Sequence, residues 1–131
     1  MIVFDAGVLI AFFDPHDAFH AAANDFIDEH EHAEFVASVL TVSEALVRPA
    51  ANGRAGTLKA GLDRLGLLRI DVGEEDIVPL AEVRAATRLR MPDALVLLGA
   101  ERHGAELVTT DEVLARAAAE RGVTAHVLAA V

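Results

Sequence analysis

Four acidic residues, Asp5, Glu44, Asp93 and Asp111, are the side chains of this sequence whose type and spacing best suit a chemical role. Carboxylate oxygens are the ligands that Mg²⁺ and Mn²⁺ prefer, and an ion held by them keeps positions open for a phosphate oxygen and water. Such an ion polarises the phosphoryl group and lowers the pKa of water, so phosphodiester hydrolysis needs no cysteine, serine or histidine nucleophile. The chain contains no cysteine, which excludes disulfides, thiolate zinc sites and thiol nucleophiles.

The elements that must position these acids are predicted from hydrophobic periodicity, which alternates between strand-like and helix-like segments along the chain. A chain of 131 residues has the usual size of one domain, so we expect a single domain over residues 1–131. Strands separated by helices predict an α/β fold, a doubly wound parallel sheet of about five strands with helices on both faces. The expected strands are 2–4, 34–40, 67–72, 105–109 and 124–128, and the expected helices are 6–13, 16–29, one beginning at 41 and interrupted at Pro49, 55–65, 74–90, 91–103 and 111–121.

Three of the acids follow the expected strands. Asp5 comes directly after strand 2–4, Glu44 comes four residues after strand 34–40, and Asp111 comes two residues after Thr109. Ligands of open α/β sheets bind beyond the carboxyl ends of the strands. Asp93 begins the helix 91–103 and can point to the same edge. The sequence therefore predicts one acidic site with all four residues as metal ligands and catalytic groups.

Each acid also has a purely structural interpretation. Glu44 can complete a capping box with Thr41 as the helix N-cap, and Asp111 can be an N-cap. Asp93 can be a first-turn charge that the helix dipole favours, and Asp5 can be a turn residue. We favour a shared site because four acids converge on one edge of the predicted sheet.

Charge is distributed unevenly along the chain, whose net charge is −10. This net charge argues against sequence-independent binding of nucleic acid by the whole surface. Residues 1–47 contain no Lys or Arg. Eight of the eleven basic residues lie between 48 and 90, and we expect this segment to contact the RNA backbone. The alternative is that they belong to ordinary solvated helix faces. The eight residues are Arg48, Arg54, Lys59, Arg64, Arg69, Arg84, Arg88 and Arg90.

Other features of the sequence bear on partners and location. The hydrophobic fraction of 53% and the pair Phe12 and Phe13 predict an apolar surface covered by a second copy or another protein, although an alanine-rich composition would also raise this fraction. The beginning of the sequence, MIVFDAGVLI, has no basic leader, and no apolar run is long enough to span a membrane, so we expect a cytoplasmic protein. His16 and His20 have the spacing of a zinc-binding helix, but no HExxH pattern or third ligand accompanies them.

The sequence resembles the PIN-domain ribonuclease toxins of VapBC-type toxin–antitoxin modules, the VapC family, over essentially its whole length. The resemblance lies in VFDAGVLIAFFD with Asp5, in TVSEALVR with Glu44, and in MPDALVLLGAERHGAELVTTDEVL with Asp93 and Asp111. It implies a doubly wound α/β fold, Mg²⁺ or Mn²⁺ bound by these acids, cleavage of RNA, a homodimer and neutralisation by a cognate antitoxin. Members usually carry a small hydroxyl residue where this chain has Gly7, and often keep a threonine that Thr109 matches as a supporting residue.

Three other functions compete with a metal-dependent endoribonuclease toxin. A magnesium-binding phosphoacceptor domain needs an early acidic pair and a late lysine, whereas the only lysine is Lys59. A haloacid-dehalogenase-type phosphatase needs a second aspartate two residues after the first, where this chain has Gly7. A catalytically silent interaction module remains open, because four acids do not by themselves establish turnover.

Overall fold

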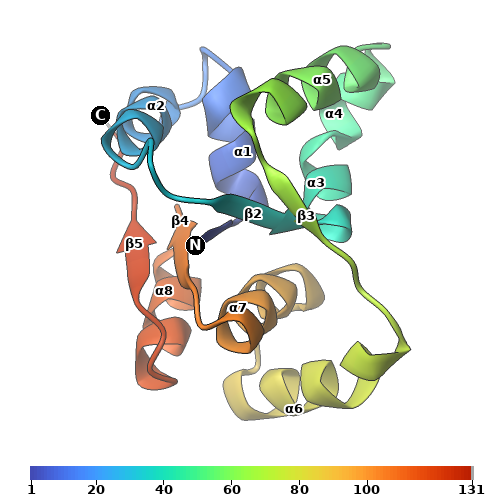
Figure 1. Cartoon of the computed structure of the whole chain (residues 1–131), viewed down its shortest axis with the longest axis vertical. Coiled ribbons are helices and arrows are strands. Elements are labelled where there is room, and N and C mark those ends of the chain that lie inside the picture. Colours follow the sequence, from blue (N-terminus) through green and yellow to red (C-terminus); the bar gives the residue numbers. More distant parts are fainter. Residues whose placement is uncertain (131) are drawn as a thin grey trace.

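The computed structural model describes residues 1–130, in which five parallel strands form one sheet between two layers of helices (Figure 1). The strand order is β3-β2-β1-β4-β5, and every neighbouring pair is parallel. This arrangement confirms the predicted doubly wound α/β fold. The strands are β1 (Ile2–Phe4), β2 (Phe35–Ser38), β3 (Leu68–Ile70), β4 (Glu106–Thr109) and β5 (Ala125–Val127).

Two hydrophobic cores lie on opposite faces of the sheet because successive side chains of a strand point to opposite sides. In β1, Ile2 and Phe4 belong to one core and Val3 to the other. The first core is covered by α1, α2, α3 and α5, and the second by α6, α7 and α8. The helices are α1 (Ala6–Phe13), α2 (His20–Glu29), α3 (Val39–Ala45), α4 (Val47–Ala51), α5 (Ala55–Leu65), α6 (Ile77–Thr87), α7 (Met91–His103) and α8 (Glu112–Glu120), with a 3₁₀ turn, η1 (Glu74–Asp76), before α6.

The predicted capping box at Thr41 is wrong. Strand β2 ends at Ser38, and Ser38 is the N-cap of α3, with its Oγ accepting the N–H of Thr41 at 3.0 Å. Thr41 lies buried inside the helix, where its own hydroxyl oxygen accepts a hydrogen bond from the Ser38 hydroxyl. The sequence signal failed because serine and threonine are both strong N-caps and stand three residues apart. Glu44 is therefore not a capping partner.

Other boundaries differ from the predicted ones by a few residues. Helix α2 begins at His20 and not at 16, because the preceding residues form turns in which the side chains of Asp14 and Asp17 accept backbone N–H groups. Pro49 does not interrupt a helix but lies in the first turn of the short α4, where its missing N–H costs no hydrogen bond. The expected helix 74–90 is divided into η1 and α6, which ends at Thr87.

The apolar surface also differs from the predicted one. Phe12 and Phe13 are half-buried and pack against the first core, so they do not form an exposed patch. The more exposed large apolar side chains include Val39, Val47 and Leu68. Within residues 1–130, none of the helices combines the length and the apolar character needed to cross a membrane.

Candidate active site

Strands β1 and β4 are neighbours at the centre of the sheet, where the strand order reverses. In doubly wound folds a crevice opens beyond the carboxyl ends of the strands at this position. Asp5 follows β1 directly, and Asp111 follows β4 by two residues. Helices return antiparallel to the strands, so the first turn of α7, which holds Asp93, lies at the same edge.

Asp5 is held through both of its carboxylate oxygens. Oδ1 accepts the N–H of Ala6 at 2.8 Å, and Oδ2 accepts the hydroxyl of Thr109 at 2.6 Å. The Thr109 oxygen in turn accepts the N–H of Asp111 at 2.9 Å. Thr109 therefore joins the end of β1 to the end of β4 through side chains, as expected for a supporting residue.

Burial raises the pKa of Asp5, a residue that is only 8% exposed. The hydrogen bonds from Thr109 and Ala6 oppose this increase, while the negative charges of Asp111 and Glu44 add to it. A buried carboxylate with anionic neighbours is costly to ionise unless a cation compensates it. The surroundings of Asp5 thus favour a bound cation or a bound proton.

Asp111 is the N-cap of α8, as its structural interpretation requires. Its Oδ1 accepts the N–H groups of Val113 at 2.8 Å and Leu114 at 3.4 Å. Its Oδ2 has no hydrogen-bond partner within residues 1–130. Capping and ligand binding are compatible for this residue because each can use a different oxygen.

Asp93 is half-buried in the first turn of α7, and its carboxylate makes no hydrogen bond with any residue in the described part of the chain. Burial raises its pKa most, and the negative charges of Asp5 and Asp111 raise it further. The guanidinium of Arg90 has the opposite effect on this pKa. Three aspartates from three elements are thus close enough to influence one another electrostatically.

Glu44 is exposed on α3, and its effect on the pKa of Asp5 is the smallest of the recognised causes. Across residues 1–130, no three His, Asp or Glu side chains are arranged so that they hold a metal ion together. The structure therefore groups Asp5, Asp93 and Asp111 at one edge, with Glu44 as the outermost of the four. In this conformation the four side chains are not close enough together to coordinate one ion jointly.

Thr110 is a neighbour of the acidic site that sequence reasoning missed. A Cβ atom added to Gly7 would lie 2.9 Å from the Thr110 Oγ1, which is closer than side chains tolerate. The Thr110 hydroxyl thus occupies the space that a side chain at position 7 would enter, beside the N-terminus of α1. The absence of a side chain at Gly7 is the sequence signal that a neighbouring group fills this space.

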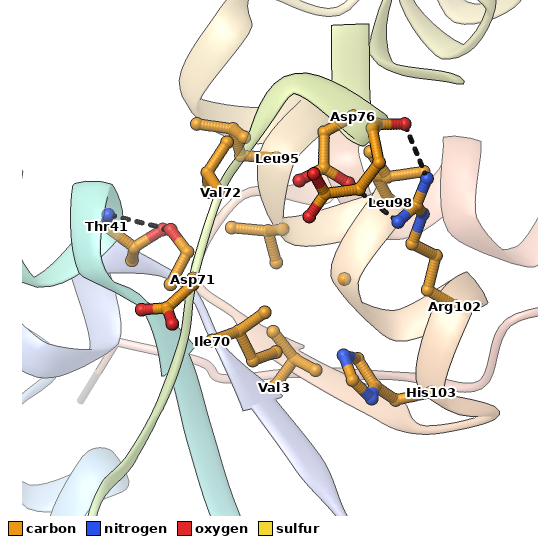
Figure 2. A pocket seen from close by; sticks show the side chains of 14 residues that line it. Val3, Thr41, Ile70, Asp71, Val72, Asp76, Leu95, Leu98, Arg102 and His103 are labelled. Carbon is orange, nitrogen blue, oxygen red and sulfur yellow. Dashed lines mark hydrogen bonds and ion pairs between the residues drawn. The ribbon is translucent and has the colours of Figure 1, made fainter. Parts of the chain in front are cut away.

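A separate cavity of about 220 Å³ lies between the end of β3 and α7, and none of the four acids lines it (Figure 2). Arg102 Nη1 pairs with Asp76 Oδ1 at 2.8 Å, and Arg102 Nη2 donates to the carbonyl oxygen of Glu75 at 3.0 Å. Asp76 Oδ2 also accepts the N–H of Gly73 at 2.9 Å. These charged groups fasten η1 to α7, so we assign them a structural role.

Comparison with known proteins places the fold. A chain of a toxin–antitoxin complex from Klebsiella pneumoniae is 21% identical, with 85% of this chain and 87% of that chain covered and a TM-score of 0.69. A chain of VapBC2 from Rickettsia felis, solved with a DNA fragment from their promoter, is 14% identical, with 98% and 100% covered and a TM-score of 0.72. PAE2754 from Pyrobaculum aerophilum is 23% identical, with 95% and 82% covered and a TM-score of 0.62.

These likenesses, all below 25% identity, show that the fold is shared. No curated protein sequence matches the chain. The family model of the PIN domain matches residues 2–120, which include all four acids and the whole sheet except β5. The chain belongs to the PIN domain family.

Proposed function

We propose that this protein is an endoribonuclease that hydrolyses RNA phosphodiester bonds with Mg²⁺ or Mn²⁺ held by Asp5, Glu44, Asp93 and Asp111. PIN domains are generally nucleases. The observation that carries the proposal is the hydrogen-bonded link from Asp5 through Thr109 to Asp111, because it fixes the Asp5 carboxylate and the Asp111 backbone at the switch point of the sheet. Asp93, whose pKa responds to both of them, completes the group.

The donor atoms fit a hard divalent cation. All the proposed ligands are carboxylate oxygens, and Asp111 Oδ2 and the whole Asp93 carboxylate have no partner in the described chain. Asp5 is buried among anionic neighbours, which a cation would neutralise. When bound, the ion supplies Lewis-acid activation of the phosphate and of a water molecule.

The residues of the chain have distinct tasks in this proposal. Thr109 positions Asp5 and the backbone of Asp111, so it is a positioning residue. Glu44, on a short helix and without a capping duty, is free to turn its side chain toward the other acids. The chain has no Tyr or Trp, so RNA recognition depends on shape and phosphate contacts more than on base stacking.

The cell biology that we propose is that of a cytoplasmic toxin paired with a cognate antitoxin. Support comes from structures of similar fold, one of which is named as a toxin–antitoxin complex and another as VapBC2 bound to a DNA fragment from their promoter. Exposed apolar side chains on α3, α4 and β3 add support for a protein partner, and we propose that the chain also forms a homodimer.

Cleavage of a labelled single-stranded RNA tests the nuclease proposal. We expect cleavage with Mg²⁺ or Mn²⁺, complete loss with a chelator, recovery when either ion is restored, and no stoichiometric zinc in protein purified without added metal. Metal binding without cleavage of any cellular RNA would favour the interaction module. Stoichiometric zinc would contradict a site built from hard oxygen ligands.

Assembly is tested at the exposed apolar groove of about 770 Å³ between α3, α4, α5 and β3. Val47 lines this groove and is 64% exposed, while Val78 on α6 is 62% exposed and lies outside it. We expect Val47→Glu to weaken self-association or antitoxin binding at least tenfold, because it places a charge in an apolar contact, and Val78→Glu to have little effect. A wild-type chain that sediments as a monomer at high micromolar concentration, and that co-purifies with no partner, would contradict this proposal.

A further inference from the structure

The connection between α6 and α7 contains the only non-glycine residue with a positive φ within residues 1–130. Arg88, directly after α6, has φ 63° and ψ 14°. This left-handed conformation suits glycine and is unfavourable for a long side chain. Backbone strain of this kind persists where the surrounding structure enforces it, often at a functional site.

Three contacts fix this connection. Leu89 is buried in the second core, at 5% exposure. Its N–H donates to Thr87 Oγ1 at 3.2 Å, and its carbonyl oxygen accepts Arg84 Nε at 3.2 Å. Because Leu89 is anchored inward and the chain is extended at Arg90, the residues on either side of Leu89 project to the surface.

Arg88 and Arg90 are both exposed, and neither guanidinium makes a hydrogen bond or an ion pair with residues 1–130. By contrast, Arg102 and Arg121 are paired with Asp76 and Glu101. Four other arginines are also unpaired in the described part of the chain, so what distinguishes these two is their position at the start of α7 in a chain with a net charge of −10. Their α-carbons are at most about 7 Å apart along the extended segment.

Arg90 lies beside the acidic site, and Arg88 is two residues before it in the chain. Arg90 is the N-cap residue of α7, three residues before Asp93, and its charge acts on the Asp93 carboxylate. A phosphodiester that approaches the acids is repelled by their negative charge until cations compensate it. Fixed arginines at the rim supply positive charge next to the point where the backbone of a nucleic acid must enter, and guanidinium groups bind phosphate oxygens through two hydrogen bonds.

We propose that Arg88 and Arg90 form a phosphate-binding site for the backbone of single-stranded RNA beside the scissile bond. This inference rests on the proposed ribonuclease function and assigns its substrate contacts. The Thr87 to Arg90 connection, anchored by Leu89, holds both arginines next to the first turn of α7, so they bind phosphates on the flank of the scissile bond nearest Asp93. They contribute to substrate affinity, while the acids carry out the chemistry.

Steady-state cleavage of a labelled single-stranded RNA in Mn²⁺ tests this assignment with the variants Arg88→Gly, Arg88→Lys and Arg90→Gln. A single-strand phosphate contact contributes about 0.7 to the slope of log affinity against log salt, so its loss weakens binding about fivefold at 0.1 M salt. We expect Arg88→Gly and Arg90→Gln each to raise KM about fivefold, with kcat changed less than twofold and a shallower salt dependence. Arg88→Lys keeps the charge but cannot make the paired hydrogen bonds of a guanidinium, so its KM should lie between those of wild type and Arg88→Gly.

Arg64→Gln is the matched control, because the structure places Arg64 away from the acids although it belongs to the basic segment 48–90. Arg64 is exposed in the last turn of α5, which leads to the amino end of β3 at the opposite edge of the sheet, and its loss changes the net charge equally. The melting temperature separates an effect on binding from an effect on folding. Because glycine suits the left-handed backbone at position 88, Arg88→Gly should leave the melting temperature unchanged or raise it by about 2 °C. Equal KM values for Arg64→Gln, Arg88→Gly and Arg90→Gln, in an enzyme that cleaves RNA, would overturn the assignment alone. A wild-type protein that neither binds nor cleaves RNA would overturn the proposed function as well.

Discussion

Replacing Asp93 by asparagine is expected to reduce RNA cleavage more than a thousandfold while the fold persists. The carboxylate of Asp93 makes no hydrogen bond within the described chain, so the isosteric amide breaks no contact there. If it is a metal ligand, its loss removes several kcal/mol of transition-state stabilisation, and about 4 kcal/mol corresponds to a thousandfold in rate. Cleavage of a labelled RNA in Mn²⁺ and the far-ultraviolet circular dichroism spectrum measure the two effects.

Glu112→Gln provides the matched control for this substitution. Glu112 is an exposed acid in the first turn of α8, directly after Asp111, and its neutralisation changes the net charge by the same amount. We expect its cleavage rate to remain within about threefold of the wild-type rate. Wild-type cleavage by the Asp93 variant, or an equal loss in both variants, would show that Asp93 is not a ligand.

Asp111→Asn is expected to raise the melting temperature of the metal-free protein and to reduce the stabilisation that Mg²⁺ or Mn²⁺ provides. Asparagine caps a helix nearly as well as aspartate, and the Oδ1 that accepts two N–H groups becomes the amide oxygen. The substitution therefore isolates the charge, whose repulsion by a close carboxylate costs about 1 kcal/mol or more. We expect an increase of about 3 °C in chelator, measured by thermal unfolding.

The pH dependence of this increase has a defined sign. Burial, with a smaller contribution from the charge of Asp111, raises the pKa values of Asp5 and Asp93 above the ordinary aspartate value of 3.8, so the folded state holds their protons more tightly than the unfolded state. The repulsion is then absent near pH 4 and grows as pH rises through the raised values toward neutrality. The increase in melting temperature caused by Asp111→Asn should therefore become larger as pH rises.

The metal response of the same variant completes the test, because an ion that binds only the folded state stabilises it in proportion to its affinity. Asp5→Asn is a less clean probe, since both oxygens of Asp5 accept hydrogen bonds and an amide can accept only on one side. An Asp111 variant with lower melting in chelator and an undiminished response to metal would show that Asp111 serves only as a cap.

Periodicity was sufficient to predict the layers of this fold, because strands buried on both faces and helices with one apolar side leave distinct patterns. The predicted helix 91–103 matches α7, which ends where Gly104 adopts a left-handed conformation with φ 58°. The boundary after β2 was not predictable in the same way. Ser38 and Thr41 compete for one cap, and only the packing of Thr41 into the interior decides between them.

The proposed acidic site follows from the order of the elements, but its geometry does not. Strand ends and helix starts were enough to bring Asp5, Asp93 and Asp111 to one edge. Thr109 is 104 residues from Asp5 in the sequence, and its hydroxyl reaches the Asp5 carboxylate only because β1 pairs with β4. Hydrophobic periodicity does not encode this pairing. The strained Arg88 was also invisible, since its conformation is imposed by the anchoring of Leu89 and opposes the preference of arginine.

The shared space between Gly7 and Thr110 has a consequence for how this sequence can evolve. A Cβ at position 7 would lie 2.9 Å from the Thr110 hydroxyl, so a side chain there requires the threonine side chain to turn away. We expect a serine or alanine at position 7 to be tolerated better when position 110 carries no hydroxyl. The effects of substitutions at these two positions should therefore depend on each other, although the positions are over a hundred residues apart.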